Sequence, residues 1–182
     1  MGLVPAGPVT TRLVALGSRV AAHSQRWLTP CFGSGARVVK DCVMPITPLS
    51  YAHVRLTVTD IARSRAFYDD VFGLPVAFEV PVDADDATKE QLGFLFGGVI
   101  YAMGGSLFGL RPVATDRFDE DRVGLDHVCF AVAGLADIEA MIALLDERGH
   151  PHSGIKDLGV GYILEFRDPD NIALELFAAK AA

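Results

Sequence analysis

Two histidines and one carboxylate occupy positions from which they could share a metal ion. His53 lies in the segment AHVRLTV and His127 in the segment DHVCFAV, and the same apolar Val follows each. Glu175 interrupts the apolar run IALELF, where an unpaired carboxylate would be expensive to bury. Two imidazoles and one carboxylate suit Fe(II), Mn(II), Zn(II), Ni(II) or Co(II), and three protein ligands leave positions for substrate or water. The three residues therefore predict one divalent metal ion in an enzymatic pocket.

The two histidines belong to a repeat, in which His53 matches His127 and Gly73 matches Gly149. Val54, Val58, Ala66 and Pro75 match Val128, Val132, Ala140 and Pro151 in the same way. Chance rarely produces so many matches, and a repeat of this length indicates two copies of one structural module. The aligned segments are AHVRLTVTDIARSRAFYDDVFGLP and DHVCFAVAGLADIEAMIALLDERGHP.

Each copy begins with a predicted strand, at 52–58 and 126–132, where apolar residues alternate with other residues. A helix follows each strand. Asp60 is the expected N-cap of the first helix, and the second covers 136–148 before Gly149 ends it.

Three extended segments follow each helix. They lie at 77–80, 91–102 and 106–111 in the first copy, and at 152–157, 161–166 and 172–177 in the second. Asp168-Pro169-Asp170-Asn171 predicts a tight turn that closes an antiparallel hairpin. The pattern predicts an α+β fold in which two paired β-α-β-β-β modules form a curved, cavity-enclosing mixed sheet with helices outside.

Side chains alternate along a strand, so the residues of one parity line the expected cavity. This places Arg55 beside His53, and Glu165 on the same face as Glu175. Arg55 is a candidate clamp for a substrate carboxylate or phosphate, or one half of an internal salt bridge to Glu165. Glu165 is a candidate general base, a substitute metal ligand, or a solvated side chain paired with Arg167 or Lys156.

These segments resemble the vicinal oxygen chelate superfamily, which includes glyoxalases, methylmalonyl-CoA epimerases, extradiol dioxygenases and glyoxalase-like antibiotic-resistance proteins. The resemblance covers about residues 50–178 and is most specific in the two opening strands and in FRDPDNIALELF. It implies a metal at the module interface and catalysis by chelation of two adjacent substrate oxygens. The family's ligand positions match His53, His127, Glu175 and Gly109.

Gly109 cannot be a ligand, which disfavours a four-ligand glyoxalase-type site. Two histidines and one carboxylate resemble the ligand set of the extradiol dioxygenases of this superfamily. Where those enzymes have an acid-base tyrosine before the final turn this chain has Glu165, and Lys156 stands near the position of a supporting histidine. Glu165 is therefore the expected catalytic residue, and ring-cleaving dioxygenase activity is one candidate beside lyase or isomerase chemistry. The alternative is a metal-free protein that sequesters a drug or another small molecule.

The charge distribution separates an N-terminal segment from the rest of the chain. The formal net charge is -7, yet residues 1–43 hold Arg12, Arg19, Arg26, Arg37 and Lys40 against a single acid, Asp41. We interpret residues 1–46 as a poorly ordered extension, because Met44 can be the true start and the segment resembles a transit peptide only in composition. The expected domain covers 47–180, with modules at about 50–112 and 124–178.

Net charge, apolar runs and cysteine content limit the classes of binding partner that we expect. The acidic body predicts no binding to nucleic acid or to an anionic membrane, and no apolar run of membrane-spanning length occurs. Three cysteines without a CxxC pair favour a reducing cytoplasm, with Cys129 as a small buried residue. The expected partner is a small-molecule substrate, and a homodimer is possible because the modules can pair within one chain or between two.

Overall fold

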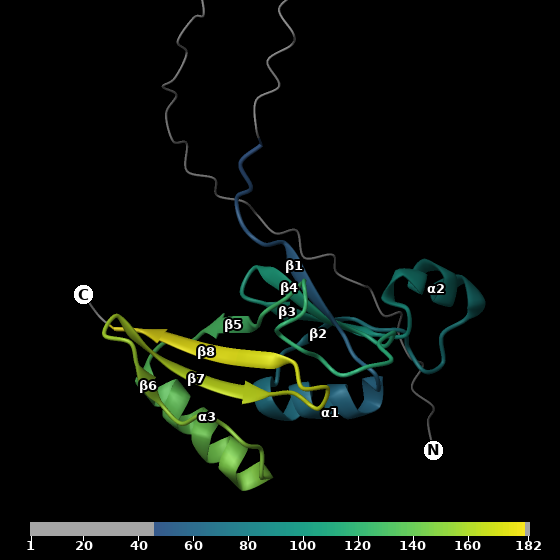
Figure 1. The fold of residues 1–182 in the computed structure, drawn as a ribbon. Coiled ribbons are helices and arrows are strands. Elements are labelled where there is room, and N and C mark those ends of the chain that lie inside the picture. The colour runs from purple at the N-terminus through teal and green to yellow at the C-terminus, as the bar shows by residue number, and fades with distance from the viewer. Residues whose placement is uncertain (1–45, 181–182) are drawn as a thin grey trace, which may run out of the picture. The chain divides into compact units, whose positions relative to one another are not determined.

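The computed structural model describes residues 46–180, which belong to one compact unit (Figure 1). The expected extension at 1–46 lies outside these residues, apart from Ile46. None of the helices in 46–180 is long and apolar enough to cross a membrane.

The first module consists of β1 (His53–Thr57), α1 (Ile61–Phe72), β2 (Val76–Phe78), α2 (Asp86–Gln91), the 3₁₀ turn η1 (Gly93–Leu95), β3 (Val99–Met103) and β4 (Ser106–Arg111).

The second module repeats the same order of strands and sheet pairing. It consists of β5 (Val128–Ala131), α3 (Leu135–Arg148), β6 (Lys156–Asp157), β7 (Gly161–Arg167) and β8 (Ala173–Ala179). The sheet orders are β1-β4-β3-β2 and β5-β8-β7-β6; β1 and β5 run parallel to their neighbours, and the other pairs are antiparallel. The α+β class and the two β-α-β-β-β modules are confirmed.

The helix ends follow from capping chemistry. Asp60 caps α1, since its carboxylate accepts hydrogen bonds from the backbone N–H of Ala62 and Arg63 at 2.9 and 3.1 Å. Gly73 and Gly149 end α1 and α3 in the left-handed conformation, which glycine adopts without a steric penalty.

One predicted strand is wrong over most of its length. The segment 91–102 was expected to be extended, but residues 86–95 contain α2 and η1, and β3 starts only at Val99. Asp85 initiates α2 by accepting a hydrogen bond from Thr88 N at 2.8 Å. The expected strand at 152–157 is also short, because β6 has two residues and His152 makes only an isolated bridge to Phe166.

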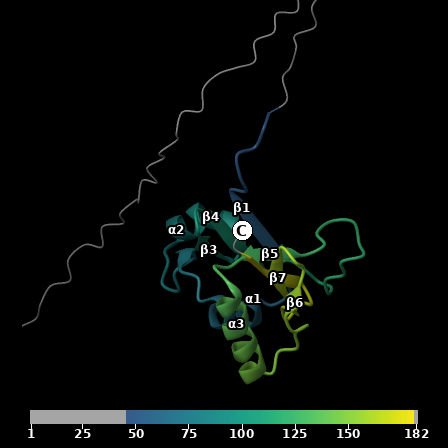
Figure 2. The ribbon, with the colours of Figure 1, turned by 90° about the vertical axis from the view of Figure 1, so that its left-hand side faces the viewer.

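The two modules share one apolar core, formed by the sheet faces next to the helices. Phe72 of α1 lies between the modules, with its ring centroid 4.8 Å from that of Phe130 in β5 and 6.2 Å from that of Phe166 in β7. Arg148 of α3 donates to Asp70 of α1 at 2.7 Å. Figures 1 and 2 show α1 and α3 next to one another below the strands. The opposite face of each sheet carries the predicted site residues; His53, Thr57 and Cys129 on it are exposed, whereas Ile100 and Ile163 are buried.

Candidate active site

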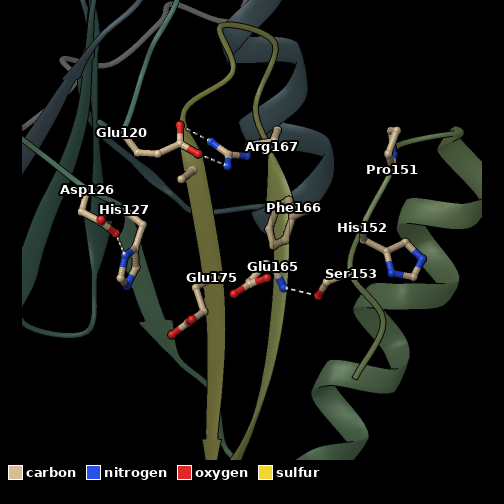
Figure 3. A pocket seen from close by; sticks show the side chains of 11 residues that line it. Glu120, Asp126, His127, Pro151, His152, Ser153, Glu165, Phe166, Arg167 and Glu175 are labelled. Carbon is tan, nitrogen blue, oxygen red and sulfur yellow. Dashed lines mark hydrogen bonds and ion pairs between the residues drawn. The ribbon is translucent and has the colours of Figure 1, made fainter. Parts of the chain in front are cut away.

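A pocket of about 530 Å³ opens on the outer face of the second sheet (Figure 3). His127, Glu165 and Glu175 line it, as the strand parity predicted. The register explains why they meet: Glu175 of β8 pairs with Cys129 of β5 on one side and with Glu165 of β7 on the other. Three adjacent strands therefore place one thiol and two carboxylates in a row, with His127 just before the start of β5.

His127 has one ring nitrogen engaged and one available. Its Nδ1 contacts the carboxylate of Asp126, while no hydrogen bond from Nε2 occurs among the described residues. The bond with Asp126, followed by the charges of Glu175 and Glu165, raises the pKa of His127. A carboxylate that holds one imidazole nitrogen directs the other nitrogen toward a metal in many metal sites. Sequence reasoning missed Asp126, although its place directly before His127 was a possible signal.

The two carboxylates of the row differ in their partners. Glu165 forms an ion pair with Lys156 at the edge of the sheet, and its backbone N–H donates to Ser153 Oγ at 3.0 Å. Glu175 is half-buried and takes part in none of the ion pairs in 46–180. Like charges directly opposite on neighbouring strands destabilise a sheet, so this position favours a bound cation.

His53 does not line the pocket that holds Glu175. It lies on a separate groove of about 360 Å³ between β1 and β5, which His127 and Cys129 also reach. In residues 46–180 no group of three or more His, Cys, Asp or Glu side chains is close enough to hold a metal. One chain thus brings His127 and Glu175 together and leaves His53 apart, and the three-ligand set stays a prediction.

Arg55 lies on the outer face of the first sheet, as expected, but is not paired with Glu165. Its guanidinium donates to the carbonyl oxygens of Phe94 and Leu95, both at 3.0 Å. Gly109, the position that would carry the fourth ligand, faces Arg55 in the register of β1 and β4. A Cβ at position 109 would lie 3.1 Å from Arg55 Cγ. The side chain of Arg55 therefore occupies the space that a ligand side chain at position 109 would need.

Cys129 is exposed, so the expectation that it is buried is wrong. Its position on the site face follows from the alternation of β5, whose opposite parity supplies the buried Phe130. Partial burial and the neighbouring Glu175 carboxylate raise the pKa of the Cys129 thiol to about 12. At neutral pH the thiol is protonated and therefore a poor nucleophile.

Two sheets of equal topology, each with a histidine at the start of its first strand, define a paired-module protein with a site on the outer sheet faces. The chain belongs to the Glyoxalase/Bleomycin resistance protein/Dioxygenase superfamily, whose family model matches residues 50–176. The resemblance inferred from the sequence is confirmed.

Three relatives illustrate the similarity. The uncharacterized protein YaeR of Escherichia coli (strain K12) is 31% identical over 127 residues, which cover 69% of this chain and 92% of YaeR. A glyoxylase/bleomycin resistance protein/dioxygenase domain from Frankia sp. EAN1pec has a TM-score of 0.60 and 28% identity over 74% of this chain and all of that one. A mutant of the fosfomycin resistance protein FosX from Listeria monocytogenes, complexed with Mn(II) and 1S,2S-dihydroxypropylphosphonic acid, has a TM-score of 0.54 and 16% identity over 75% of this chain and 95% of that one, and shows the fold alone.

Proposed function

We propose that the protein is a metal-dependent lyase or isomerase that acts on a small substrate with two adjacent oxygens. The main support is Glu175, a half-buried carboxylate opposite Glu165 and without a cationic partner in 46–180. His127, with Nδ1 held by Asp126 and Nε2 available, is a fitting second ligand. A divalent metal bound there would supply a Lewis acid that polarises substrate oxygens.

His53 is the proposed third ligand, and we infer that a second copy of the chain supplies it. The shared core lies on the helix side of both sheets, and His53 and His127 are exposed, so another molecule can reach both histidines. Within one chain, His53 shares a groove with His127 but does not line the pocket that holds Glu175. A two-fold dimer would bring the first face of one copy to the second face of the other, and so form two equivalent sites.

Glu165 is the proposed acid-base residue. It lines the same pocket as Glu175, directly across the strand pair. Lys156 and Ser153 hold its side chain and backbone, so the carboxylate has a fixed position from which to remove a proton next to a substrate carbonyl. Removal of such a proton fits lyase or isomerase chemistry.

Metal analysis of mixed variants tests the ligand set and the dimer together. His127→Ala and His53→Ala proteins, each purified without chelator, should both lack stoichiometric Fe, Mn, Zn, Ni or Co. After co-refolding in equal amounts, half of the dimers are mixed and each mixed dimer has one intact site, so about a quarter of the sites should regain metal. No recovery would show that each site is built within one chain.

His152→Ala is a matched control, because this histidine lines the same pocket but has both ring nitrogens engaged. Nε2 contacts Asp146 at 3.1 Å, and Nδ1 accepts from Gly154 N at 3.0 Å. Its replacement should leave the metal content unchanged. Full metal content in the His127→Ala protein would contradict the proposed site.

A metal-free sequestering protein is the second candidate. The groove that holds His53 favours it, because Leu107, Phe108 and Phe130 form an apolar wall suited to an aromatic ligand. Such a protein would bind its ligand equally well with and without chelator, whereas the proposed enzyme requires the metal.

A further inference from the structure

We infer that Arg55 and Arg111 form a binding site for an oxyanion on the outer face of the first sheet. The inference also gives the class of substrate, and this conclusion rests on the proposed function. The substrate would carry a carboxylate, phosphate or phosphonate group in addition to its two adjacent chelating oxygens.

The register of β1 and β4 places the two arginines on the same face. Arg55 pairs with Gly109, and Arg111 lies two residues further along β4, opposite Thr57. Residues two apart on a strand share a face, so both side chains lie over the same part of the sheet. Gly109 carries no side chain on this face, and the stem of Arg55 packs against it, since a Cβ there would lie 3.1 Å from Arg55 Cγ.

Neighbouring groups hold both guanidinium groups in place before any ligand binds. Arg55 donates to the carbonyl oxygens of Phe94 and Leu95 in the turn that follows α2. Arg111 lies over the ring of Phe96, 4.1 Å from its centroid. Fixing two long side chains in advance lowers the entropic cost of binding a ligand.

The two cations lack a counter-ion among the described residues. Arg63, Arg65, Arg122, Arg148 and Arg167 each pair with a carboxylate. Arg55 and Arg111 take part in none of these ion pairs, and their Nε atoms are the only buried side-chain N or O atoms in 46–180 without a hydrogen-bond partner. Burial and the charge of Arg111 lower the pKa of Arg55. An oxyanion that accepts from both guanidinium groups would relieve this repulsion.

The position of the pair relative to His53 sets the dimensions of the substrate. Arg55 and Thr57, the partner of Arg111, lie two and four residues beyond His53. With a strand rise of about 3.3 Å per residue, the anion would lie roughly 7 to 13 Å from the position of His53. The exposed rings of Phe78 and Phe94, 6.3 Å apart, lie beyond the arginines toward the β2 edge of the sheet, where an apolar part of a ligand could contact them.

Pairing with carboxylates of a second copy is the competing role for these arginines. On the second sheet Glu165 already pairs with Lys156, and Glu120 with Arg167. Glu175 remains, and it is the proposed metal ligand. The charges of the acidic face are thus largely balanced within its own module, which favours an external anion as the partner of the arginine pair.

Binding of phenylphosphonate to the full chain, measured by calorimetry after removal of metal with EDTA, tests the inference. The wild-type protein should bind phenylphosphonate at least about tenfold more tightly than benzyl alcohol, and the preference should shrink as the salt concentration rises. Arg111→Gln should weaken phenylphosphonate binding about tenfold or more while benzyl alcohol binding stays the same. Arg122→Gln is the matched control, since Arg122 forms an exposed pair with Asp116 at 2.7 Å.

Several results would overturn the inference. One is equal binding of phenylphosphonate and benzyl alcohol by the wild-type protein, and another is undiminished phenylphosphonate binding by the Arg111→Gln protein. A shift of the monomer–dimer equilibrium in that variant, with anion binding unchanged, would assign the arginines to a subunit contact. Because the titration is done without metal, a failure of the proposed metal site would leave its outcome intact, and Arg111→Gln should keep the metal content of the wild type.

Discussion

The two modules have the same strand order and register but opposite chemistry at equivalent positions. In the first module Arg55 faces Gly109 across β1 and β4, whereas in the second Cys129 faces Glu175 across β5 and β8. On the next strand of each sheet, the residue in register is the apolar Ile100 of β3 in the first module and Glu165 of β7 in the second. One sheet therefore presents cations on its outer face, and the other presents carboxylates.

This difference shows how a repeated fold can separate two tasks. The backbone fixes which positions face outward in both modules, and the side chains then decide whether the face attracts a metal or an anion. A substrate with chelating oxygens and an anionic group needs both faces. Substitutions at single positions test this difference between the modules.

Replacement of Glu165 by Gln should have the largest effect. Gln keeps the shape of the side chain but cannot take up a proton, so removal of a carbon-bound proton should slow by about 10² to 10⁴-fold. Exchange of the carbon-bound protons of hydroxyacetone into D₂O, followed by NMR, measures this step directly. The metal content should stay at the wild-type level.

Glu120→Gln is the control for that variant, because Glu120 lines the same pocket but is paired with Arg167. It should change the exchange rate by less than about tenfold. Loss of metal in the Glu165→Gln protein would make Glu165 a ligand instead, and a normal rate would make it a structural partner of Lys156.

The hairpin turns of the two modules also differ. In the first module β3 and β4 are joined by Gly104 and Gly105. The corresponding turn of the second module contains two buried aspartates that bind the first module: Asp170 accepts from Thr59 N at 2.9 Å and pairs with Arg63, and Asp168 accepts from Tyr68 Oη at 3.1 Å. This turn therefore ties the modules together.

The two aspartates should have opposite effects on stability. Burial raises the pKa of Asp168 to about 6, so its contribution to stability is full below about pH 4 and is lost as the pH rises through 6. Asp168→Asn keeps an acceptor for the backbone N–H groups of Asp170 and Ile172. We expect its free energy of unfolding, relative to the wild type, to improve by about 1–2 kcal/mol between pH 4.5 and pH 7 in urea titrations.

Asp170→Asn is the contrasting variant. Although burial alone would raise the pKa of Asp170, the hydrogen bonds from Thr59 and the charge of Arg63 lower it. This variant should lose about 2 kcal/mol at pH 7 and less at low pH, where the wild type loses the same interaction. The same pH dependence in both variants would show that the two carboxyl groups are not in different environments.

Local patterns were sufficient to predict most of the fold. Alternation identified β1, β4, β5, β7 and β8 and their outward faces, and the capping residues gave the ends of α1 and α3. The segment 91–98 failed because a short apolar run fits a strand or a helix equally well. Asp85 caps α2, which ends at Gln91, whereas η1 at Gly93–Leu95 has no side-chain cap that could have revealed it.

Strand parity predicted which site residues share a face of a sheet, but nothing more about the site. Parity placed Glu165 with Glu175, but it could not reveal the distance between His53 and that pair. It also could not reveal that Arg55 binds the carbonyl of Phe94, 39 residues away, or that Thr59 binds Asp170, 111 residues away. Such contacts depend on how the modules and loops pack, which no local pattern encodes.

Gly109→Ala should have the smallest effect. It tests whether the conformation of Arg55 requires the absence of a side chain at position 109. The new Cβ would lie 3.1 Å from Arg55 Cγ and 3.2 Å from Ile100 Cγ1, so Arg55 must shift. Crowding of this kind costs about 1–3 kcal/mol, and the lower backbone entropy of Ala returns roughly 0.5–1 kcal/mol, so the net loss in urea titrations should be about 1 kcal/mol. Phenylphosphonate binding should weaken as well, while the metal content stays the same. Gly93→Ala, where nothing lies within 4 Å of the new Cβ, should change stability by less than about 0.5 kcal/mol. A Gly109→Ala protein that is more stable than the wild type and binds phenylphosphonate normally would show that Arg55 does not need the space, and the contrast between Gly109 and Glu175 would then have no bearing on anion binding.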